Sequence, residues 1–200
     1  MADLFEHRAK DYDARPLPQQ ISEGVFRALE SKVRLKDDLQ VMDFGAGTGL
    51  IAGKVAPRVD KIIAVDISQA MLAQLARKAD LEGKVQVECR DLFESPLDTQ
   101  VDLIVSAMAL HHVRDTPRLL ATFHDHLRPG GRVALADLDA EDGTFHPPGT
   151  EGVFHHGFDR DEFRGQLATA GFEEVELVTA CEVEREGRSY PIFLAVARRP

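Results

Sequence analysis

The run Val41-Met42-Asp43-Phe44-Gly45-Ala46-Gly47-Thr48-Gly49 constrains the fold of this 200-residue chain more than any other stretch. An apolar segment ends at an acid, and three glycines at alternate positions lead into residues 50–56, which can continue as a helix. Glycine has no Cβ and tolerates positive φ, so a strand entering such a turn brings backbone N–H groups close to a ligand. The run therefore predicts a strand, a glycine turn and a helix that together cradle a small ligand.

After residue 39 the chain alternates β-rich and helical patterns, which is typical of a mostly parallel sheet covered by helices. Seven strands are expected, at 41–44, 61–66, 85–89, 101–106, 132–138, 175–183 and 192–196. Glu186-Gly187 lies between the last two and predicts a short antiparallel hairpin. The expected fold class is therefore α/β, with a seven-stranded, mostly parallel sheet, helices on both faces and an antiparallel C-terminal hairpin.

Two segments outside this alternation complete a single expected domain over residues 1–200. Residues 1–35 form a helical leader, with a break at Pro16-Leu17-Pro18 and then a short second helix. Residues 139–158 carry four glycines, two prolines and three histidines, a composition typical of a loop. A loop of this length in a compact domain is usually a lid, a binding loop or disordered, so we expect a substrate-side loop here.

Charge and cysteine content narrow the classes of function. The chain has 24 Lys and Arg against 34 Asp and Glu, and its net charge of −10 opposes attraction to a nucleic-acid backbone. Cys89 and Cys181, the only cysteines, stand in apolar segments, so we expect small buried side chains rather than a disulfide or zinc knuckle. The first residues are too charged for a signal peptide, and no apolar stretch reaches the ~20 residues of a membrane span. We expect a cytoplasmic protein without membrane or nucleic-acid partners.

The glycine turn is supported by acids at the ends of two later strands. Asp66 is placed to accept from both hydroxyls of a ribose, and Asp91 to accept from a base amine. The spacing Gly45-x-Gly47-x-Gly49 differs from the dinucleotide fingerprint G-x-G-x-x-G, because Leu50 stands where the third glycine would fall. The pattern thus disfavours a nicotinamide-binding oxidoreductase.

Several motifs, in this order, resemble the class I S-adenosylmethionine-dependent methyltransferases, in the small-molecule branch similar to methyltransferase types 11 and 12. They are Asp43 to Gly49, Val65-Asp66, Asp91-Leu92, Ala109 to Val113, Leu127 to Gly131 and Ala170-Gly171-Phe172, together with a leader, Phe5 to Asp13, similar to F-(D/E)-x-x-A-x-x-Y-D. The resemblance covers nearly the whole chain. It implies a Rossmann-like fold, S-adenosyl-L-methionine as cofactor and S-adenosyl-L-homocysteine as product.

The resemblance also implies a role for each matching position. The methionine moiety would lie on the glycine turn and near Ser106, under Tyr12; Asp66 would bind the ribose, and Ile67, Met71, Asp91 and Leu92 would surround the adenine. The expected cofactor-binding residues are Tyr12, Asp43, Gly45, Ala46, Gly47, Thr48, Gly49, Asp66, Ile67, Met71, Asp91, Leu92 and Ser106.

The reaction expected of the family is an in-line displacement at the sulfonium methyl, for which the protein mainly supplies alignment. A base is needed only if the acceptor must lose a proton, and histidine suits that task. His111 leaves the fourth strand near the expected methyl position, while His155 and His156 lie in the long loop, so these three are the catalytic candidates. No metal site is expected, because no H-x-x-x-H or H-x-x-E spacing places ligands on one face.

The acceptor class is inferred mainly from missing signatures. Ser106-Ala107-Met108 lacks the (D/N)-P-P-(Y/F) signature of amino-group methylation on nucleobases and glutamine, and also the Pro-Cys pair of cytosine-carbon methylation. With the acidic charge, this favours a small-molecule substrate. Two alternatives stay open: an S-adenosylmethionine-binding partner or sensor without catalysis, and a methyltransferase acting on a protein or other macromolecule.

Overall fold

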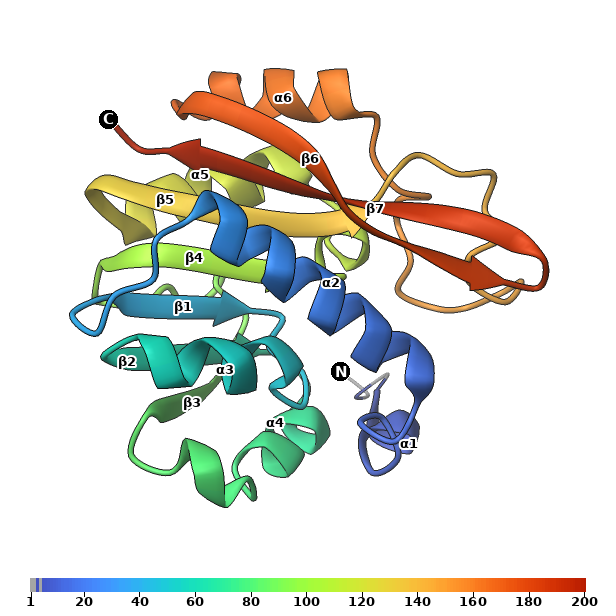
Figure 1. Cartoon of the computed structure of the whole chain (residues 1–200), viewed down its shortest axis with the longest axis horizontal. Coiled ribbons are helices and arrows are strands. Elements are labelled where there is room, and N and C mark those ends of the chain that lie inside the picture. The colour runs from blue at the N-terminus through green and yellow to red at the C-terminus, as the bar shows by residue number, and fades with distance from the viewer. Residues whose placement is uncertain (1–2, 4) are drawn as a thin grey trace.

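The structure, a computed structural model, describes residue 3 and residues 5–200. Its centre is a seven-stranded sheet in the order β3-β2-β1-β4-β5-β7-β6 (Figure 1). The strands are β1 (Gln40–Phe44), β2 (Lys61–Asp66), β3 (Val85–Cys89), β4 (Val101–Ala107), β5 (Leu127–Leu138), β6 (Glu173–Arg185) and β7 (Arg188–Arg198). Only β7 runs antiparallel to its neighbours, β5 and β6. The predicted fold class is confirmed.

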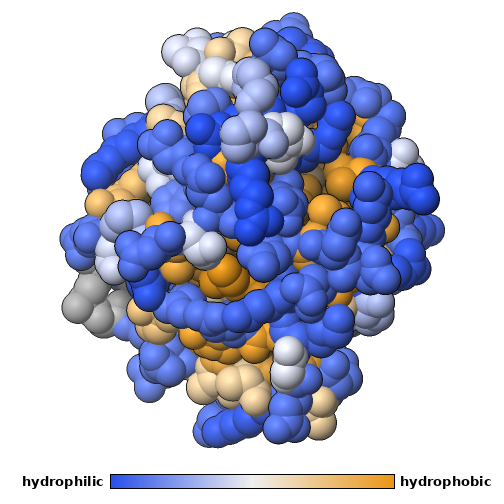
Figure 2. All heavy atoms as spheres, turned by 90° about the vertical axis from the view of Figure 1, so that its left-hand side faces the viewer, coloured by the Kyte–Doolittle hydropathy of each residue, from blue (hydrophilic) through white to orange (hydrophobic). Residues whose placement is uncertain are grey.

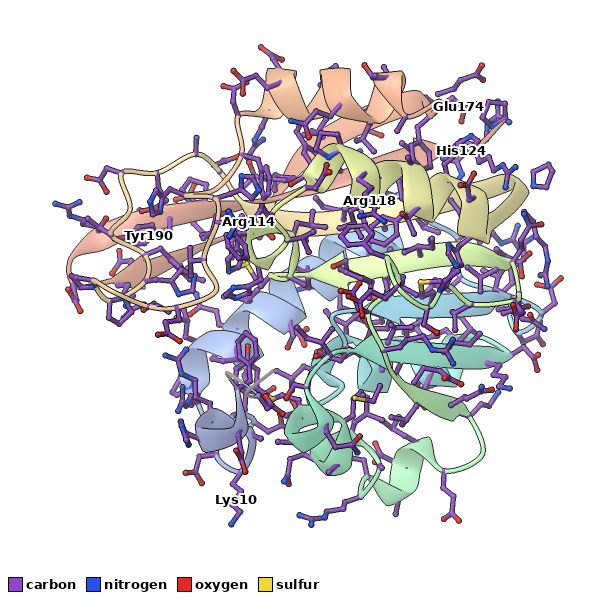
Figure 3. All side chains as sticks on the ribbon, turned by 180° about the vertical axis from the view of Figure 1, so that it is seen from behind. Lys10, Arg114, Arg118, His124, Glu174 and Tyr190 are labelled. Carbon is purple, nitrogen blue, oxygen red and sulfur yellow. The ribbon has the colours of Figure 1, made fainter. Side chains whose placement is uncertain are left out.

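Helices cover both faces of the sheet. They are α1 (Glu6–Ala9), α2 (Pro16–Lys32), α3 (Leu50–Val55), α4 (Gln69–Leu75), α5 (Thr116–His126) and α6 (Arg160–Thr169), with short 3-10 helices η1 (Ala56–Arg58), η2 (Ala79–Leu81) and η3 (Leu110–His112). Buried side chains of α2, α3 and α4 form one core with the sheet, and those of α5 and α6 form the other. Figure 1 shows the first face and Figure 3 the second.

The two cores follow from the alternation of side chains along each strand. In β1, Val41 packs into the α2–α3 side and Met42 into the α5–α6 side. In β2, Ile62 packs into the α2–α3 side and Ile63 into the α5–α6 side. Because a parallel strand is covered on both faces, both sets of side chains are apolar, and the carboxyl ends of β1, β2 and β4 are left to form a site at one edge.

The N-terminal leader continues as a helix through the prolines where the sequence predicts a break. The predicted break at Pro16-Leu17-Pro18 is wrong, because α2 begins at Pro16 and runs for 17 residues. Proline is tolerated in the first turn of a helix, where its missing N–H has no intrahelical acceptor. Ile21, Val25 and Leu29 form the buried face of α2, as their spacing predicts.

The two cysteines are less buried than the sequence predicts. Cys89 is exposed and Cys181 is half-buried, so neither is the fully buried side chain that its apolar segment predicts. Cys89 ends β3, which is the edge strand of the sheet and has no strand beyond it to cover its outer side. An edge position thus explains why a β-rich run there is largely exposed.

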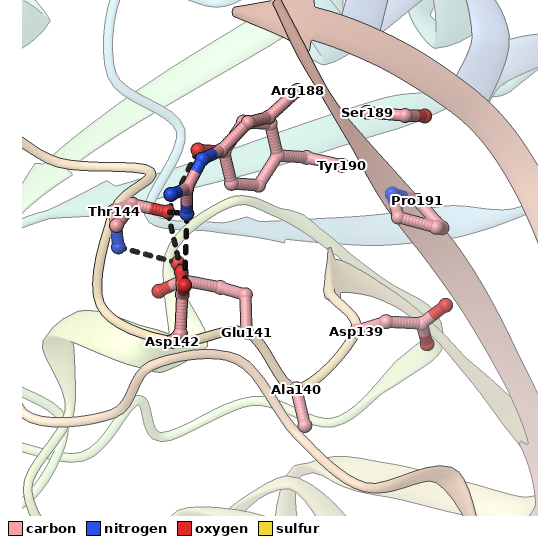
Figure 4. A pocket seen from close by; sticks show the side chains of 9 residues that line it. All are labelled: Asp139, Ala140, Glu141, Asp142, Thr144, Arg188, Ser189, Tyr190 and Pro191. Carbon is pink, nitrogen blue, oxygen red and sulfur yellow. Dashed lines mark hydrogen bonds and ion pairs between the residues drawn. The ribbon is translucent and has the colours of Figure 1, made fainter.

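The C-terminal hairpin and the long loop pack against each other. Glu186 and Gly187 join β6 to β7 with φ values of 52° and 76°, as in the turn of a tight hairpin. Residues 139–158 contain no helix or named strand, as predicted. Arg188 donates to the Asp142 carboxylate at 2.8 Å, and the Thr144 and Tyr190 hydroxyls lie 2.9 Å apart (Figure 4). These groups border a hollow of about 430 Å³ and hold the first part of the loop against the hairpin.

The face at the amino ends of the parallel strands is mainly hydrophilic, with hydrophobic residues between the polar ones (Figure 2). Of the helices that the structure describes, none has the length and apolar composition needed to cross a membrane.

Candidate functional site

The glycine turn after β1 has the backbone conformation that its sequence predicts. Gly45, Gly47 and Gly49 have φ values of 66°, 55° and 83°, a region that residues with a Cβ rarely adopt. A Cβ added to Gly45 would lie 2.3 Å from the Ala109 Cβ, so this position excludes any side chain. The Gly47 N–H donates to the Asp66 carboxylate at 2.8 Å. The turn therefore connects the ends of β1 and β2 and leaves its backbone open to a ligand.

A cavity of about 860 Å³ lies at the carboxyl ends of these strands. It is lined by most of the residues expected to bind the cofactor, namely Tyr12, Asp43, Gly45, Ala46, Gly47, Thr48, Asp66, Ile67, Met71, Asp91 and Leu92. Gly49 and Ser106 are outside this lining. Gly49 precedes α3 as its N-cap, and the buried Ser106 hydroxyl donates to the Phe44 carbonyl at 2.9 Å. The structure thus gives Ser106 a strand-linking contact rather than a position at the cavity wall.

Two acids line the cavity at the ends of β1 and β2: the buried Asp43 and the half-buried Asp66. Asp43 is 2% exposed, and its Oδ2 atom has no hydrogen-bond partner among the described residues. Burial raises the pKa of Asp43 to about 8, and the nearby Asp66 charge adds to the shift. Burial also raises the pKa of Asp66, although the N–H groups of Ser68 and Gly47 donate to its carboxylate and oppose the shift. An unpaired, buried carboxyl oxygen beside a glycine turn fits a ligand with an ammonium group.

The leader is fixed over the glycine turn by contacts that its sequence does not reveal. The Thr48 hydroxyl donates to the Asp13 carboxylate at 2.5 Å, and the Lys78 ammonium lies 2.6 Å from the other Asp13 oxygen. Asp3 accepts from the Ser68 hydroxyl at 2.8 Å. Between these anchors the Tyr12 side chain faces the cavity, where burial raises the pKa of its phenol. The segment therefore closes one side of the cavity.

Three histidines meet at the other end of the cavity. His111, in η3 after β4, and His112 are joined by His146 from the long loop. The Nε2 atoms of His111 and His146 lie 3.1 Å apart, and one ring nitrogen of each histidine lies within 4.8 Å of the others. The sequence places His146 in the long loop, and local spacing does not reveal that this loop brings His146 back to η3.

Buried partners orient this cluster. The His111 Nδ1 atom lies 2.7 Å from the Asp137 carboxylate, which is fully buried at the end of β5. Burial opposes ionisation of Asp137, but the charge and hydrogen bonds of His111 hold the pKa of this carboxyl below its usual value. Burial lowers the pKa of His112 and of His146 to about 4, and the neighbouring His111 adds to both shifts. These two imidazoles are therefore neutral at pH 7.

The other two catalytic candidates are not in the cluster. His155 Nε2 lies 2.9 Å from the Val113 carbonyl and 3.2 Å from the Thr116 hydroxyl, so it ties the loop to the start of α5. The His156 side chain is 65% exposed, near the Glu141 carboxylate. Neither is among the described residues that line the cavity, so the expectation that they face an acceptor is corrected. Proximity in sequence to His146 does not bring them into the cavity, because the His155 ring contacts the Val113 carbonyl and the His156 ring lies near Glu141.

Four arginines line the cavity without forming an ion pair in the described part of the chain. They are Arg8, Arg15, Arg114 and Arg185. Arg185 donates to the Phe145 carbonyl, and the charges of Arg8 and Arg185 contribute to the low pKa of His146. Sequence reasoning does not single out these arginines, because they come from the leader, the end of η3 and the hairpin.

Comparison with known proteins identifies the family. A family described as "Methyltransferase domain" matches residues 41–131. The chain is 30% identical over 214 residues to a malonyl-[acyl-carrier protein] O-methyltransferase of Geobacter sulfurreducens, covering 98% of this chain and 78% of that protein. This chain belongs to the class I S-adenosylmethionine-dependent methyltransferases.

Two further comparisons place this methyltransferase among its relatives. An uncharacterized methyltransferase of Schizosaccharomyces pombe is 30% identical over 146 residues, which are 61% of this chain and 49% of that protein. The chain therefore spans about half the length of that relative. The crystal structure of the N-methyltransferase NodS from Bradyrhizobium japonicum with S-adenosyl-L-homocysteine superposes with a TM-score of 0.71 at 19% identity, covering 94% of this chain and 90% of that one. The methyltransferase fold is thus shared along almost the entire chain.

The residues of this methyltransferase fit the cofactor of its family, S-adenosylmethionine. The fit rests on the unpaired Asp43 oxygen, which suits an ammonium, and on the glycine turn, where a Cβ at Gly45 would collide with Ala109. It also rests on Ile67, a large apolar side chain that is 64% exposed at the cavity wall and that an adenine ring would cover.

Proposed function

We propose that this methyltransferase transfers the methyl group of S-adenosylmethionine, by in-line displacement, to a small molecule that carries a carboxylate or phosphate. The proposal rests on the four cavity arginines that form no ion pair among the described residues, because they line one cavity in a chain of net charge −10. The fifth arginine at the cavity, Arg90, pairs with Glu88. The acids that line the same cavity are Asp43, Asp66 and Asp91, which all belong to the cofactor motifs. Arg8 and Arg185 lie near His146 and lower its pKa, so we assign positive charge to the end of the cavity that would receive the acceptor. Guanidinium groups suit bidentate binding of carboxylate or phosphate.

The cofactor half of the cavity is assigned from the same geometry. Asp66, at the end of β2, would accept from the ribose hydroxyls, and Asp43 from the methionine ammonium. Ile67 and Met71 would flank the adenine, with Asp91 and the Leu92 N–H at its edge. The backbone from Gly45 to Thr48 would bind the methionine moiety under Tyr12. S-Adenosylmethionine supplies a sulfonium methyl with a leaving group that is already positively charged.

This chain's own contribution is alignment and exclusion of water. Residues 1–35 and 139–158 would act as lids, since Phe5 and Arg8 from the first segment and Phe145 and His146 from the second line the cavity. Fixing the acceptor in line with the methyl can contribute roughly 7–11 kcal/mol to lowering the barrier. Asp137 holds the Nδ1 atom of His111, so His111 would meet an acceptor group through its Nε2 atom, which lies 3.1 Å from His146 Nε2.

The Geobacter sulfurreducens relative is named as an O-methyltransferase of malonyl-[acyl-carrier protein]. For this chain, that name supports an acceptor with an acidic oxygen. The cavity volume of about 860 Å³ is near the upper end of the usual ~300–1,000 Å³ for small-ligand pockets, which leaves room for a small acceptor beside the cofactor.

The test is production of S-adenosylhomocysteine with a panel of small mono-, di- and tricarboxylates and phosphate monoesters, each paired with a neutral amide or alcohol analogue. We expect turnover with at least one anionic member and at least tenfold less with its neutral analogue. Turnover confined to neutral or cationic acceptors would overturn the anionic assignment. Cofactor binding without turnover on small molecules or on a macromolecular extract would favour the partner or sensor function instead.

A matched pair of variants locates the cationic end. Arg8 lines the cavity, whereas Lys10, two residues later, is exposed and points away from it (Figure 3). Arg8→Met should raise the acceptor KM by about tenfold or more, the effect of losing a charged hydrogen bond of ~1.5–3 kcal/mol, and Lys10→Met should leave it unchanged. If Arg8→Met instead weakens S-adenosylhomocysteine binding and leaves the acceptor KM intact, Arg8 binds the cofactor carboxylate.

A further inference from the structure

We propose that His111, His112 and His146 form a binding site for a divalent first-row transition metal ion of the zinc class. One ring nitrogen of each imidazole lies within 4.8 Å of those of the other two. All three residues line the acceptor end of the cavity, so an ion there would face the substrate space rather than the protein interior. Neutral imidazole is a usual ligand for zinc and its neighbours in the first row.

The first ligand is oriented by a buried carboxylate. His111 Nδ1 lies 2.7 Å from Asp137 Oδ1, and Asp137 is held in turn by the Leu138 N–H at 2.8 Å and the His111 N–H at 3.2 Å. Because the His111 Nδ1–H donates to the carboxylate, Nε2 is the His111 atom that would bind a metal ion, once it has no proton. Carboxylate–histidine pairs of this kind orient metal-binding imidazoles and raise their basicity.

The second ligand, His112, comes from η3, and the third, His146, comes from the long loop. His112 Nδ1 lies 2.7 Å from the Gly152 carbonyl, so this ring is fixed in the tautomer with Nε2 free. His146 Nε2 lies 3.1 Å from His111 Nε2. Zinc–nitrogen bonds of ~2.0–2.1 Å in tetrahedral geometry place the donors about 3.4 Å apart, close to the separation observed for that pair. The His112 donor lies within 4.8 Å of the other two, so it would have to approach them by at most about 1.4 Å.

Three protein ligands leave a coordination position for water or an acceptor atom, as in catalytic rather than structural zinc sites. The positive charges of Arg8 and Arg185 act on His146 and would oppose binding of a divalent cation. The negative charge of the Asp137 carboxylate, which contacts His111, would favour binding. An anionic ligand at the open position would offset the arginine charges. The proposal does not depend on the identity of the acceptor, because the ion is held by the protein.

The alternative is a hydrogen-bonded cluster without an ion, in which the His146 Nε2–H donates to His111 Nε2. The two arrangements differ in what they predict for added metal. Only the metal site gives stoichiometric binding that depends on all three imidazoles, and only it brings a spectroscopic change when cobalt replaces zinc.

The test is a titration of the chelator-treated protein, without cofactor or acceptor, with Zn²⁺ against a chromophoric chelator and with Co²⁺ followed by visible absorption. We expect one equivalent of Zn²⁺ with Kd in the micromolar range or tighter, and Co²⁺ bands of four- or five-coordinate intensity that change when azide is added. His146→Gln should weaken Zn²⁺ binding at least tenfold. His156→Gln, from the same loop but 65% exposed and outside the cluster, should not.

His146 is half-buried in a loop, so its variant is expected to fold, and equal melting temperatures of the metal-free proteins check this. If that variant misfolds, His112→Gln provides the same comparison. Zn²⁺ binding that is equal in the wild type, His146→Gln and His156→Gln would overturn the proposal, as would Kd in the millimolar range. Co²⁺ bands that azide leaves unchanged would refute the proposed coordination position for water or an acceptor atom. Because no methyl transfer is measured, these outcomes are separate from those for the proposed function.

Discussion

Asp43→Asn tests the electrostatics of the glycine turn directly. The Asp43 carboxyl is buried, one of its oxygens lacks a partner among the described residues, and its pKa is about 8 in the folded protein against an ordinary 3.8. The folded chain therefore keeps a proton on Asp43 between pH 4 and pH 8, whereas the unfolded chain has lost it. Stability must fall as pH rises through this window, because the folded state binds more protons than the unfolded state.

The size of the effect follows from the shift. Each pH unit between the two pKa values corresponds to about 1.4 kcal/mol, so Asp43 lowers the free energy of unfolding by about 2.7 kcal/mol between pH 5 and pH 7. Asparagine has nearly the same shape but does not titrate. Its amide adds a buried group without a partner, which costs about 1–3 kcal/mol at every pH. The readout is therefore the slope of stability with pH rather than its absolute value.

The assay is urea unfolding of cofactor-free wild type and Asp43→Asn at pH 5, 6 and 7, with exposed Asp38→Asn as the matched control. The stability of Asp43→Asn relative to the wild type should rise by about 1.4 kcal/mol per pH unit, while the Asp38→Asn difference stays flat. Parallel pH profiles for wild type and Asp43→Asn would refute the reasoning, because they would mean that Asp43 ionises normally in the folded protein.

Three further predictions concern the same cavity. Gly45→Ala should weaken S-adenosylhomocysteine binding at least tenfold in calorimetry, because the added Cβ would collide with Ala109. In Gly53→Ala, within α3, the added Cβ meets no atom within 4 Å, so this variant should be more stable by ~0.5–1 kcal/mol in urea unfolding. Asp66→Ala should weaken cofactor binding at least tenfold by removing a charged acceptor, and an unchanged calorimetric Kd would remove Asp66 from the site. Protease nicking within residues 139–158 should slow when cofactor and acceptor are both bound, and equal cleavage rates would contradict a lid role.

The parts of the fold that the sequence predicts are those governed by local chemistry. Ser68 caps α4 by accepting from the Met71 N–H, and Asp159 caps α6 by accepting from two backbone N–H groups, as short-range patterns indicate. The central strands β1, β2 and β4 follow from apolar runs, because a strand covered on both faces is mostly apolar. The edge strand β3 follows instead from alternation of apolar and polar residues. The glycine turn and Asp66 meet because β1 and β2 are parallel neighbours.

The acceptor end is less predictable for a physical reason. Its groups meet only through tertiary contacts: His146 is brought to His111 by a loop without hydrophobic periodicity, and Arg185 by the far end of a 13-residue strand. No spacing rule links positions so far apart. Because they are histidines in the same loop as His146, His155 and His156 are expected near the acceptor. In the structure His155 contacts the Val113 carbonyl instead, and His156 is exposed.

The two halves of the cavity therefore differ in how they can change. The cofactor half is built from residues at the ends of adjacent parallel strands, so a substitution at Gly45 or Asp66 also disturbs contacts that join β1 to β2. The acceptor half is built from the leader, the long loop and the hairpin, which contribute side chains such as Arg8, His146 and Arg185 without forming the parallel sheet. His111 joins the halves, because it follows β4 and contacts Asp137 on β5, and the leader joins them through the Asp13–Thr48 hydrogen bond. A change of acceptor can thus occur by substitution in the outer segments while cofactor binding is retained.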